Sequence, residues 1–269
     1  MRIDQLPAVR DRFAEIAQRL EGMTPAVFLD FDGTLSPIVD DPAAAYLPDA
    51  TRAALLRLRE QCWVAVMSGR DADDVRGRIG IDDLVYAGSH GFDVIWPDGR
   101  REQRGTEHRH RLHEAEQLLR EALEAVPGAE LEPKGFAVAI HYRRVPEDRV
   151  PEVEDAVARV ASNVDGLRRT GGKKVFELRP DMDWDKGRAL LWLLAELGLD
   201  GEEVLPLYLG DDLTDEDGFA ALEEHGGGLG LLVRGEADER DTRADYAMAD
   251  VDEAGEVIAR LAGMLERRS

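Results

Sequence analysis

Short apolar runs alternate along the chain with segments in which apolar residues recur every three or four positions. The runs are rich in β-branched or aromatic residues, and each is followed closely by Gly, Asp or Ser. They lie at Ala26–Leu29, Trp63–Met67, Leu84–Ala87, Leu205–Leu209 and Leu229–Val233, and they predict buried parallel strands. Helical spacing at residues 49–58, 71–78, 186–197 and 255–265 predicts helices between them. This alternation predicts an α/β fold, with a doubly wound, Rossmann-like parallel-sheet core.

In a doubly wound sheet, ligands bind beyond the carboxyl ends of the strands, so the residues that follow each apolar run are the first candidates for chemistry. The first run leads into Asp30, Asp32, Gly33 and Thr34. Acids beside glycine are also common in plain polar turns. At a strand end, however, two carboxylates are unfavourable unless a cation neutralises them or one is protonated. Mg²⁺ prefers such a site, completed by water and phosphate.

A second acidic stretch follows the run at Leu205–Leu209. Its acids are Asp211, Asp212, Asp215, Glu216 and Asp217. Such a stretch is usually a solvated face, but one that follows a buried strand is expected at the same sheet edge as the first acidic pair. We therefore interpret it as a source of further metal ligands.

Two residues with phosphate-binding chemistry stand near the same edge. Ser68 directly follows the run at Trp63–Met67, in Ser68-Gly69-Arg70, and Lys186 opens a predicted helix. A hydroxyl, an ammonium and the amides of a helix N-terminus are suitable partners for phosphate. A Ser-Gly turn or a surface lysine is common in any protein, so each residue is informative only in combination with the acids.

Composition narrows the class of protein. The chain has 269 residues, 43% of them hydrophobic, which suits one large domain or a domain with a sizeable insertion. Its formal net charge of -22 argues against nucleic acid and anionic membranes as partners. Cys62 is the only cysteine, so neither an intramolecular disulfide nor a Cys-rich zinc site can form. Charged residues interrupt each apolar run near the N-terminus, which argues against a signal peptide or a membrane span. Together with the single cysteine, this predicts a cytoplasmic protein, and we expect a monomer.

Residues 105–180 differ from the rest of the chain in charge. They hold 13 basic and 14 acidic residues, a net of -1, and leave -21 of the total to the remainder. This asymmetry indicates a separate module.

Within this module, a strand-like alternation separates an apolar face from a smaller, polar one. The apolar set is Phe136, Val138, Ile140 and Tyr142, and the other set is Ala137, Ala139, His141 and Arg143. The same alternation predicts that Lys173 and Glu177 share a face. A face of Arg, Lys, Glu and His suits a sugar, whose hydroxyls need both donors and acceptors. An exposed sheet face with ordinary surface charges is the alternative.

Taken together, the strand-end residues resemble the four motifs of the haloacid dehalogenase-type phosphohydrolases. The motifs are Asp30-x-Asp32-Gly33-Thr34, Ser68, Lys186 and Gly210-Asp211-Asp212-x-x-Asp215. Within that superfamily the sequence most resembles the trehalose-6-phosphate phosphatases. The similar segments are Leu29–Val39, Val66–Arg70, Ala87–Gly91, Lys134–Arg143, Gly172–Glu177 and Trp184–Gly187. The resemblance runs from about Ala26 to the C-terminus and leaves out a leading helix that we expect before it.

The resemblance implies hydrolysis of trehalose 6-phosphate, the last step of trehalose biosynthesis. Asp30 would be the nucleophile that forms an aspartyl-phosphate, and Asp32 would act as general acid and then as general base. A Mg²⁺ cofactor would be held by a carboxylate oxygen of Asp30, the backbone carbonyl of Asp32 and Asp211.

The remaining motif residues would act on the phosphate or on the metal site. Ser68 and Lys186 would hold the non-bridging phosphate oxygens. We expect Asp215 to support the metal ligands or to orient Lys186, and we assign no role to Asp212.

The resemblance further implies that residues 105–180 are a substrate-specificity cap inserted into a core formed by residues 1–104 and 181–269. Arg143, Lys173 and Glu177 would be sugar-contacting residues. Further substrate-binding candidates are Arg70, His90, Lys134 and His141. The only partner expected is the small-molecule substrate.

Two other functions share parts of this pattern. A related sugar phosphatase, of the sucrose-phosphate or mannosyl-phosphoglycerate type, would differ in the cap, where the motifs above favour trehalose phosphate. A non-catalytic sugar-phosphate sensor or complex subunit would be expected to lose Asp30, Asp32 or Asp211, and all three are present.

Overall fold

A computed structural model describes residues 1–39, 41–172, 174–235 and 240–268 of the protein. The chain forms two compact units, one of Met1–Glu102 with Trp184–Ser269 and one of Gln103–Asp183. We call them the core unit and the cap unit. Their boundaries lie within three residues of those expected from the sequence. Each unit has its own sheet and its own hydrophobic cluster.

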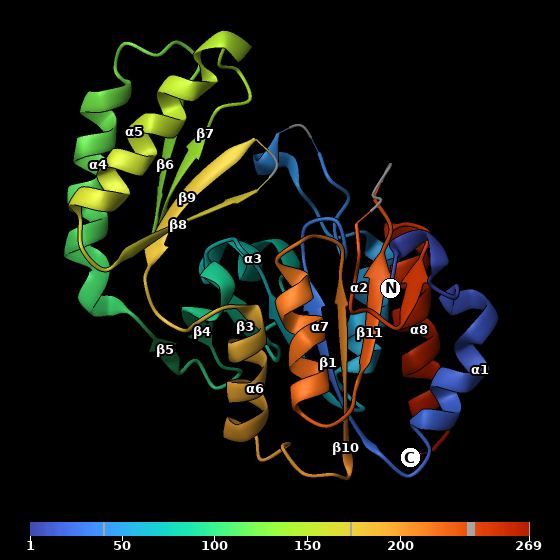
Figure 1. Cartoon of the computed structure of the whole chain (residues 1–269). Coiled ribbons are helices and arrows are strands. Elements are labelled where there is room, and N and C mark those ends of the chain that lie inside the picture. The colour runs from blue at the N-terminus through green and yellow to red at the C-terminus, as the bar shows by residue number, and fades with distance from the viewer. Residues whose placement is uncertain (40, 173, 236–239, 269) are drawn as a thin grey trace. The chain divides into compact units, whose positions relative to one another are not determined.

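The core unit is built on a sheet with the strand order β12-β11-β10-β1-β2-β3-β4-β5 (Figure 1). From β12 to β3 the neighbouring strands are parallel, and β4 is antiparallel to β3. The bounds are β1 Thr24–Asp30, β2 Trp63–Met67, β3 Val85–Gly88, β4 Asp93–Ile95, β5 Arg101–Gln103, β10 Val204–Gly210, β11 Leu229–Val233 and β12 Tyr246–Met248. The five predicted strands are present within two residues of their expected bounds. The predicted α/β class with a parallel-sheet core is confirmed.

Helices cover both faces of this sheet, with α6 and α7 on one side and α1 and α8 on the other (Figure 1). The bounds are α1 Val9–Arg19, α2 Asp49–Leu58, α3 Ala72–Ile79, α6 Lys186–Glu196, α7 Asp215–Glu224 and α8 Val251–Glu266, with short 3₁₀ turns η1 Ile3–Gln5, η2 Pro42–Ala44 and η3 Ser89–Gly91. Side chains of α1, α2, α3 and α8 form one hydrophobic cluster with β1, β2, β10 and β11. The four predicted helices and the leading helix are confirmed. Within the described residues, every helix is too short or too polar to cross a bilayer.

The start of α6 is fixed by its own sequence. The backbone N–H of Arg188 donates to Asp185 Oδ1 at 2.8 Å. A carboxylate at this position satisfies an amide that has no partner within the helix. Asp185 therefore determines that Lys186 is the first residue of α6.

The cap unit is an antiparallel sheet with the strand order β6-β7-β9-β8. Its elements are η4 Thr106–His108, α4 Arg109–Leu123, β6 Glu130–Lys134, β7 Ala137–His141, η5 Glu147–Arg149, α5 Val150–Asn163, β8 Leu167–Gly172 and β9 Val175–Pro180. Val138 and Ile140 of β7 join one cluster with apolar residues of α4 and α5, as the alternation predicts. Ala137 and Ala139 on the opposite face are also buried. That face therefore carries small side chains, but part of it is inaccessible to solvent.

The N-terminal segment belongs to the core unit. Arg2 forms an antiparallel β-bridge with Asp241, and Ala8 forms a parallel one with Ala247. The backbone N–H of Ile3 donates to the carbonyl of Arg240 at 3.2 Å. These contacts tie the leading segment to the strand edge at β12, far from it in sequence.

Candidate active site

Three neighbouring parallel strands deliver polar residues to one edge of the core sheet. Asp30 is the last residue of β1, Ser68 directly follows β2, and Asp211 directly follows β10. The strands are in register at this end, because Leu29 pairs with Leu209 and Asp30 pairs with Met67. The structure therefore brings these three residues, selected from the sequence, to a common edge.

Lys186 lies between two carboxylates. Its Nζ donates to Asp30 Oδ1 at 2.7 Å and to Asp215 Oδ1 at 2.6 Å. All three side chains are buried. Burial alone disfavours a charged lysine, but Asp215 and Asp30 outweigh it and hold the pKa of the Lys186 ammonium well above its usual value. Lys186 is therefore a fixed positive charge beside Asp30.

Asp215 accepts four hydrogen bonds, which occupy its whole carboxylate. Its Oδ1 accepts from Lys186 and from the Tyr208 hydroxyl, each at 2.6 Å. Its Oδ2 accepts from the backbone amides of Asp211 and Asp212 at 2.9 and 3.0 Å. An ionised carboxylate offers about four lone-pair positions, so this arrangement leaves none for a metal ion. Of the two roles expected for Asp215, the geometry favours orienting Lys186.

Tyr208 is a site residue that the sequence reasoning missed. Burial and the neighbouring Asp215 raise the pKa of Tyr208 well above its usual value, so its hydroxyl stays a donor. Its ring packs edge-on against Phe219, with centroids 5.5 Å apart, and a Cβ on Gly218 would lie 2.8 Å from the ring. The only sequence signal is a polar-tipped aromatic in an otherwise aliphatic strand, two residues before Gly210.

The Asp211 carboxylate lies over Gly33 in the loop that follows β1. Gly33 has a φ of +85°, and a Cβ at this position would lie 2.2 Å from Asp211 Oδ2. Glycine adopts this backbone freely and leaves the space empty. Thr34 Oγ1 donates to Asp211 Oδ1 at 3.5 Å, and Arg240, also missed from the sequence, donates through Nη2 to the Asp211 carbonyl at 3.0 Å. Gly33 and Thr34 of the first motif thus help to position Asp211 of the last motif.

Asp30 and Asp211 form an acidic site that a cation would stabilise. Carboxylate oxygens of Asp30, Asp211 and Asp215 all lie within 4.8 Å of one another. Burial raises the pKa of Asp30 and of Asp211 well above the usual value, and neighbouring acids add to it although Lys186 opposes it. Three carboxylates exceed the one Lys186 ammonium, so a divalent cation fits the charge of the site. Among the described residues, no other group of three or more acids, histidines and cysteines lies close enough together to hold a metal ion.

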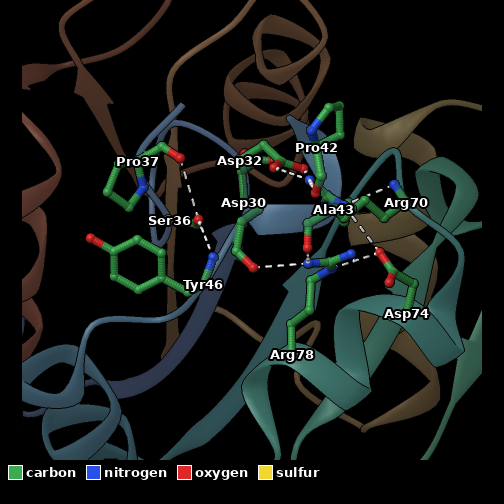
Figure 2. A network of polar contacts seen from close by, with 12 residues as sticks. Asp30, Asp32, Ser36, Pro37, Pro42, Ala43, Tyr46, Arg70, Asp74 and Arg78 are labelled. Atoms are coloured by element: carbon green, nitrogen blue, oxygen red, sulfur yellow. Dashed lines mark hydrogen bonds and ion pairs between the residues drawn. The ribbon is translucent and has the colours of Figure 1, made fainter. Parts of the chain in front are cut away.

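Asp32 is bound by Arg70 through both of its carboxylate oxygens (Figure 2). Arg70 Nε donates to Oδ2 at 2.6 Å and Nη2 donates to Oδ1 at 2.7 Å. We expected Arg70 to contact the substrate, but its guanidinium is engaged here by protein acceptors. Asp32 keeps 42% of its side chain exposed, which suits a group that exchanges protons with substrate and water.

Ser68 and His90 lie side by side after β2 and β3. The backbone N–H of His90 donates to the Ser68 carbonyl at 2.8 Å, and the Arg70 N–H donates to Ser68 Oγ at 3.1 Å. Ser89 and His90 both have a left-handed backbone, with φ of 49° and 57°, which is uncommon for residues with side chains. A Cβ on Gly69 would lie 3.0 Å from His90 Nε2. This unusual turn therefore sets the imidazole against the loop that carries Ser68.

In the cap unit, polar residues gather around Glu177. Lys134 Nζ donates to Glu177 Oε1 at 3.1 Å. Arg179 donates to Glu177 Oε2 through Nε at 2.8 Å and also through Nη2. Glu177 is buried, which by itself would raise its pKa, but Arg179 and Lys134 outweigh burial and lower it. Arg179 was missed from the sequence, although alternation in β9 places it on the same face as Glu177.

The other predicted cap residues are more dispersed. His141 Nε2 lies 2.8 Å from Glu132 Oε2, and Arg143 is exposed beyond the end of β7. Lys173 lies outside the described residues. That Lys173 shares a face with Glu177 stays a prediction.

Comparison with known proteins connects this site to one family. The chain matches the family model described as trehalose-phosphatase over residues 28–252. It is 48% identical over 273 residues to a trehalose-phosphate phosphatase of Mycolicibacterium paratuberculosis, which covers 99% of this chain and 69% of that protein. A trehalose-phosphate phosphatase of Mycobacterium tuberculosis is 45% identical over 268 residues, which covers 98% of this chain and 68% of that protein.

A solved structure shows the same fold. The C-terminal domain of the Candida albicans trehalose-6-phosphate phosphatase superimposes with a TM-score of 0.79 at 24% sequence identity. The match covers 96% of this chain and 98% of that one.

The contact between Gly33 and Asp211 is testable by substitution. We expect Gly33→Ala to lower the free energy of unfolding by about 1–3 kcal/mol more than Gly99→Ala, because the added methyl group collides with Asp211. Gly99 is the matched control, since it has a similar φ of +82° but no atom within 4 Å of an added Cβ. Urea denaturation of both variants measures the difference. Equal losses would show that Asp211 moves aside freely.

The buried Glu177 should make stability depend on pH. Its pKa in the folded protein lies below the ordinary value of a glutamate, so its stabilising contribution is full at neutral pH and is lost as pH falls through the folded pKa. Glu177→Gln should therefore cost roughly 1–3 kcal/mol at pH 7, and the gap to wild type should close in acid. Urea denaturation from neutral to acidic pH measures this gap.

Glu152→Gln is the control for that measurement. Glu152 pairs with Arg149 in the same unit, but its side chain is 51% exposed, so its loss should change the free energy of unfolding much less than the loss of Glu177 does. A Glu177→Gln gap that stayed constant with pH would contradict the ion-pair assignment.

Proposed function

Because this chain belongs to the trehalose-phosphatase family, we propose that it hydrolyses trehalose 6-phosphate through an aspartyl-phosphate formed on Asp30. The observation that carries this proposal is the position of Asp30 at the end of β1, with Lys186 Nζ at 2.7 Å from its Oδ1. A carboxylate held beside a buried cation is fixed in place and can attack a phosphorus atom bound at the same edge.

The proposed reaction has two steps. In the first, an Asp30 oxygen attacks phosphorus, the bond from phosphorus to the sugar oxygen breaks, and Asp32 gives its proton to that oxygen. In the second, water attacks the phosphorus, the bond to Asp30 breaks, and Asp32 accepts a proton from the water. Asp32 thus ends each cycle in the protonation state in which it began.

Ser68 and Lys186 are proposed to hold the non-bridging phosphate oxygens, with His90 placed beside them. A magnesium ion fits the acidic site described above, and the carboxylates of Asp30 and Asp211 with the backbone carbonyl of Asp32 would hold it. When bound, the ion would neutralise charge between the nucleophile and the phosphate. Asp215, whose lone pairs are occupied by protein donors, would keep Lys186 in position.

We propose that the polar face of the cap unit recognises the sugar. Glu177 supplies acceptors, Lys134 and Arg179 supply donors beside it, and His141 adds an imidazole that lies against Glu132. Such a mixture suits hydroxyl groups, which both donate and accept. Arg143 and Lys173 remain predicted sugar contacts, supported by the family resemblance of their motifs.

We further propose that the protein acts in the cytoplasm as a monomer and binds neither nucleic acid nor membranes. The formal net charge of -22 and the single Cys62 support this proposal, because a strongly acidic protein repels polyanions.

Replacing Asp30 by asparagine tests the nucleophile. Asp30→Asn should lower kcat roughly 10³-fold or more, since an amide cannot form the acyl-phosphate. Acid quenching with a labelled substrate should trap phosphate on the wild-type protein and none on the variant. Asp200→Asn, at an exposed position, is the control. Near-normal turnover by Asp30→Asn would refute the assignment.

A panel of sugar phosphates tests the substrate and the metal together. With Mg²⁺, kcat/KM should be at least about tenfold higher for trehalose 6-phosphate than for sucrose phosphate, mannosyl-phosphoglycerate or glucose 6-phosphate. Excess chelator should stop turnover, and added Mg²⁺ should restore it. A faster reaction with another sugar phosphate would reassign the substrate, and full activity in chelator would refute the metal proposal.

A further inference from the structure

We propose that Arg70 is a positioning residue that holds Asp32 where it exchanges protons with the leaving group and with water. The inference rests on the proposed function, in which Asp32 is the general acid and base. Figure 2 shows Arg70 between Asp32 and Asp74, with Arg78 on the other side of Asp74.

The contact between Arg70 and Asp32 fixes a direction as well as a distance. Two N–H groups of one planar guanidinium meet the two oxygens of one carboxylate at 2.6 and 2.7 Å. This fork geometry belongs to arginine and cannot be made by lysine. The Arg70 side chain is only 15% exposed, so the Asp32 carboxylate is held by a group that is itself confined.

Arg70 is in turn held by the protein. Nη1 donates to Asp74 Oδ2 at 3.1 Å, and Nη2 donates to the Pro42 carbonyl at 3.0 Å. Asp74 Oδ2 also accepts from Arg78 Nε at 2.9 Å. Positive and negative groups therefore alternate from Arg78 through Asp74 and Arg70 to Asp32.

The outer end of this chain of ion pairs is anchored to the loop that follows the first motif. Arg78 Nη1 donates to the carbonyls of Ala43 and Ala45 at 3.0 and 2.8 Å. Arg70 reaches the same loop through Pro42. The loop, α3 and Asp32 are consequently joined through two arginines, as Figure 2 shows.

The donors of Arg70 are almost fully used by the protein. Four of its N–H groups are taken by Asp32, Asp74 and Pro42, out of the five that a guanidinium carries. A direct role in binding the substrate phosphate would require these contacts to break. By contrast, Asp32 accepts only one bond from Arg70 on each oxygen, so lone pairs remain for a proton.

Two substrates whose leaving groups differ in their need for a proton distinguish a positioning role from a purely structural one. The sugar alkoxide of trehalose 6-phosphate needs a proton as it leaves, whereas p-nitrophenolate leaves without one. A misplaced Asp32 should therefore slow the first step for the sugar substrate and spare it for p-nitrophenyl phosphate. The second step is common to both substrates and should slow equally.

The test is single-turnover kinetics of Arg70→Met and Arg70→Lys with both substrates. With trehalose 6-phosphate, the first-turnover rate of Arg70→Met should fall roughly 10- to 100-fold, while KM changes less than about threefold. The p-nitrophenol burst should stay within about twofold of wild type, and labelled aspartyl-phosphate should accumulate after it. Arg70→Lys, which cannot form the fork, should recover only part of the loss.

Arg76→Met is the matched control, because Arg76 lies in α3 and pairs with Asp82 at the surface. It should behave as wild type. A loss confined to KM would make Arg70 a substrate contact, and equal losses in both first turnovers would make it a structural residue; either result overturns the proposal. If Arg70→Met does not fold, Arg70→Lys and Asp74→Asn replace it in the test. Both variants are expected to show the same difference between the two substrates, to a smaller extent.

These outcomes are separable from the failure of the proposed function. If wild-type protein forms no aspartyl-phosphate with either substrate, Asp30 is not the nucleophile and the proposed function falls. If wild type forms it and the variants show no difference between the two leaving groups, only the inference on Arg70 falls.

Discussion

A lysine ammonium buried between two carboxylates is the constraint on which the core unit depends. Lys186 is almost inaccessible to water, and a buried charge without partners would cost several kcal/mol. Its partners Asp30 and Asp215 come from β1 and the start of α7, so β1, α6 and α7 must converge at one place. The same interaction therefore holds these three elements together and fixes Asp30 beside a cation.

This arrangement also explains why the acidic residues of the site are not equivalent. Asp215 accepts hydrogen bonds from Lys186, Tyr208 and two backbone amides. Asp212 accepts from the amides of Thr214 and Asp215 and from the Thr214 hydroxyl. Asp30 and Asp211 each have a carboxylate oxygen in the acidic cluster, within 4.8 Å of the other. The positive charge of a divalent ion therefore fits beside Asp30 and Asp211, while the other two acids organise the loop.

In the cap unit, the signs of the buried charge and of its partners are reversed. There the buried group is the Glu177 carboxylate, and Lys134 and Arg179 are the cations that stabilise it. Between the two patterns, Asp32 represents an intermediate case, since it is partly exposed and yet held by Arg70 on both oxygens. In each case a carboxylate is oriented by an opposite charge whose own position is fixed by further contacts.

Sequence alone determined the strands, the principal helices and the residues that end at the common sheet edge, because these follow from local periodicity and from the rule that ligands bind at strand ends. It also identified the superfamily through four short motifs in a fixed order, and the family through six similar segments. The sequence did not determine which side chains contact one another. The partners of Asp32 and Asp215, the contributions of Tyr208, Arg179 and Arg240, and the left-handed turn at Ser89 and His90 were decided by the tertiary structure. Pairings such as Asp30 with Lys186 join residues 156 positions apart, and no local pattern records which atom meets which. Asp30 could be selected as a candidate nucleophile from its place in the chain. Its contact with Lys186, however, forms only when β1, α6 and α7 pack together.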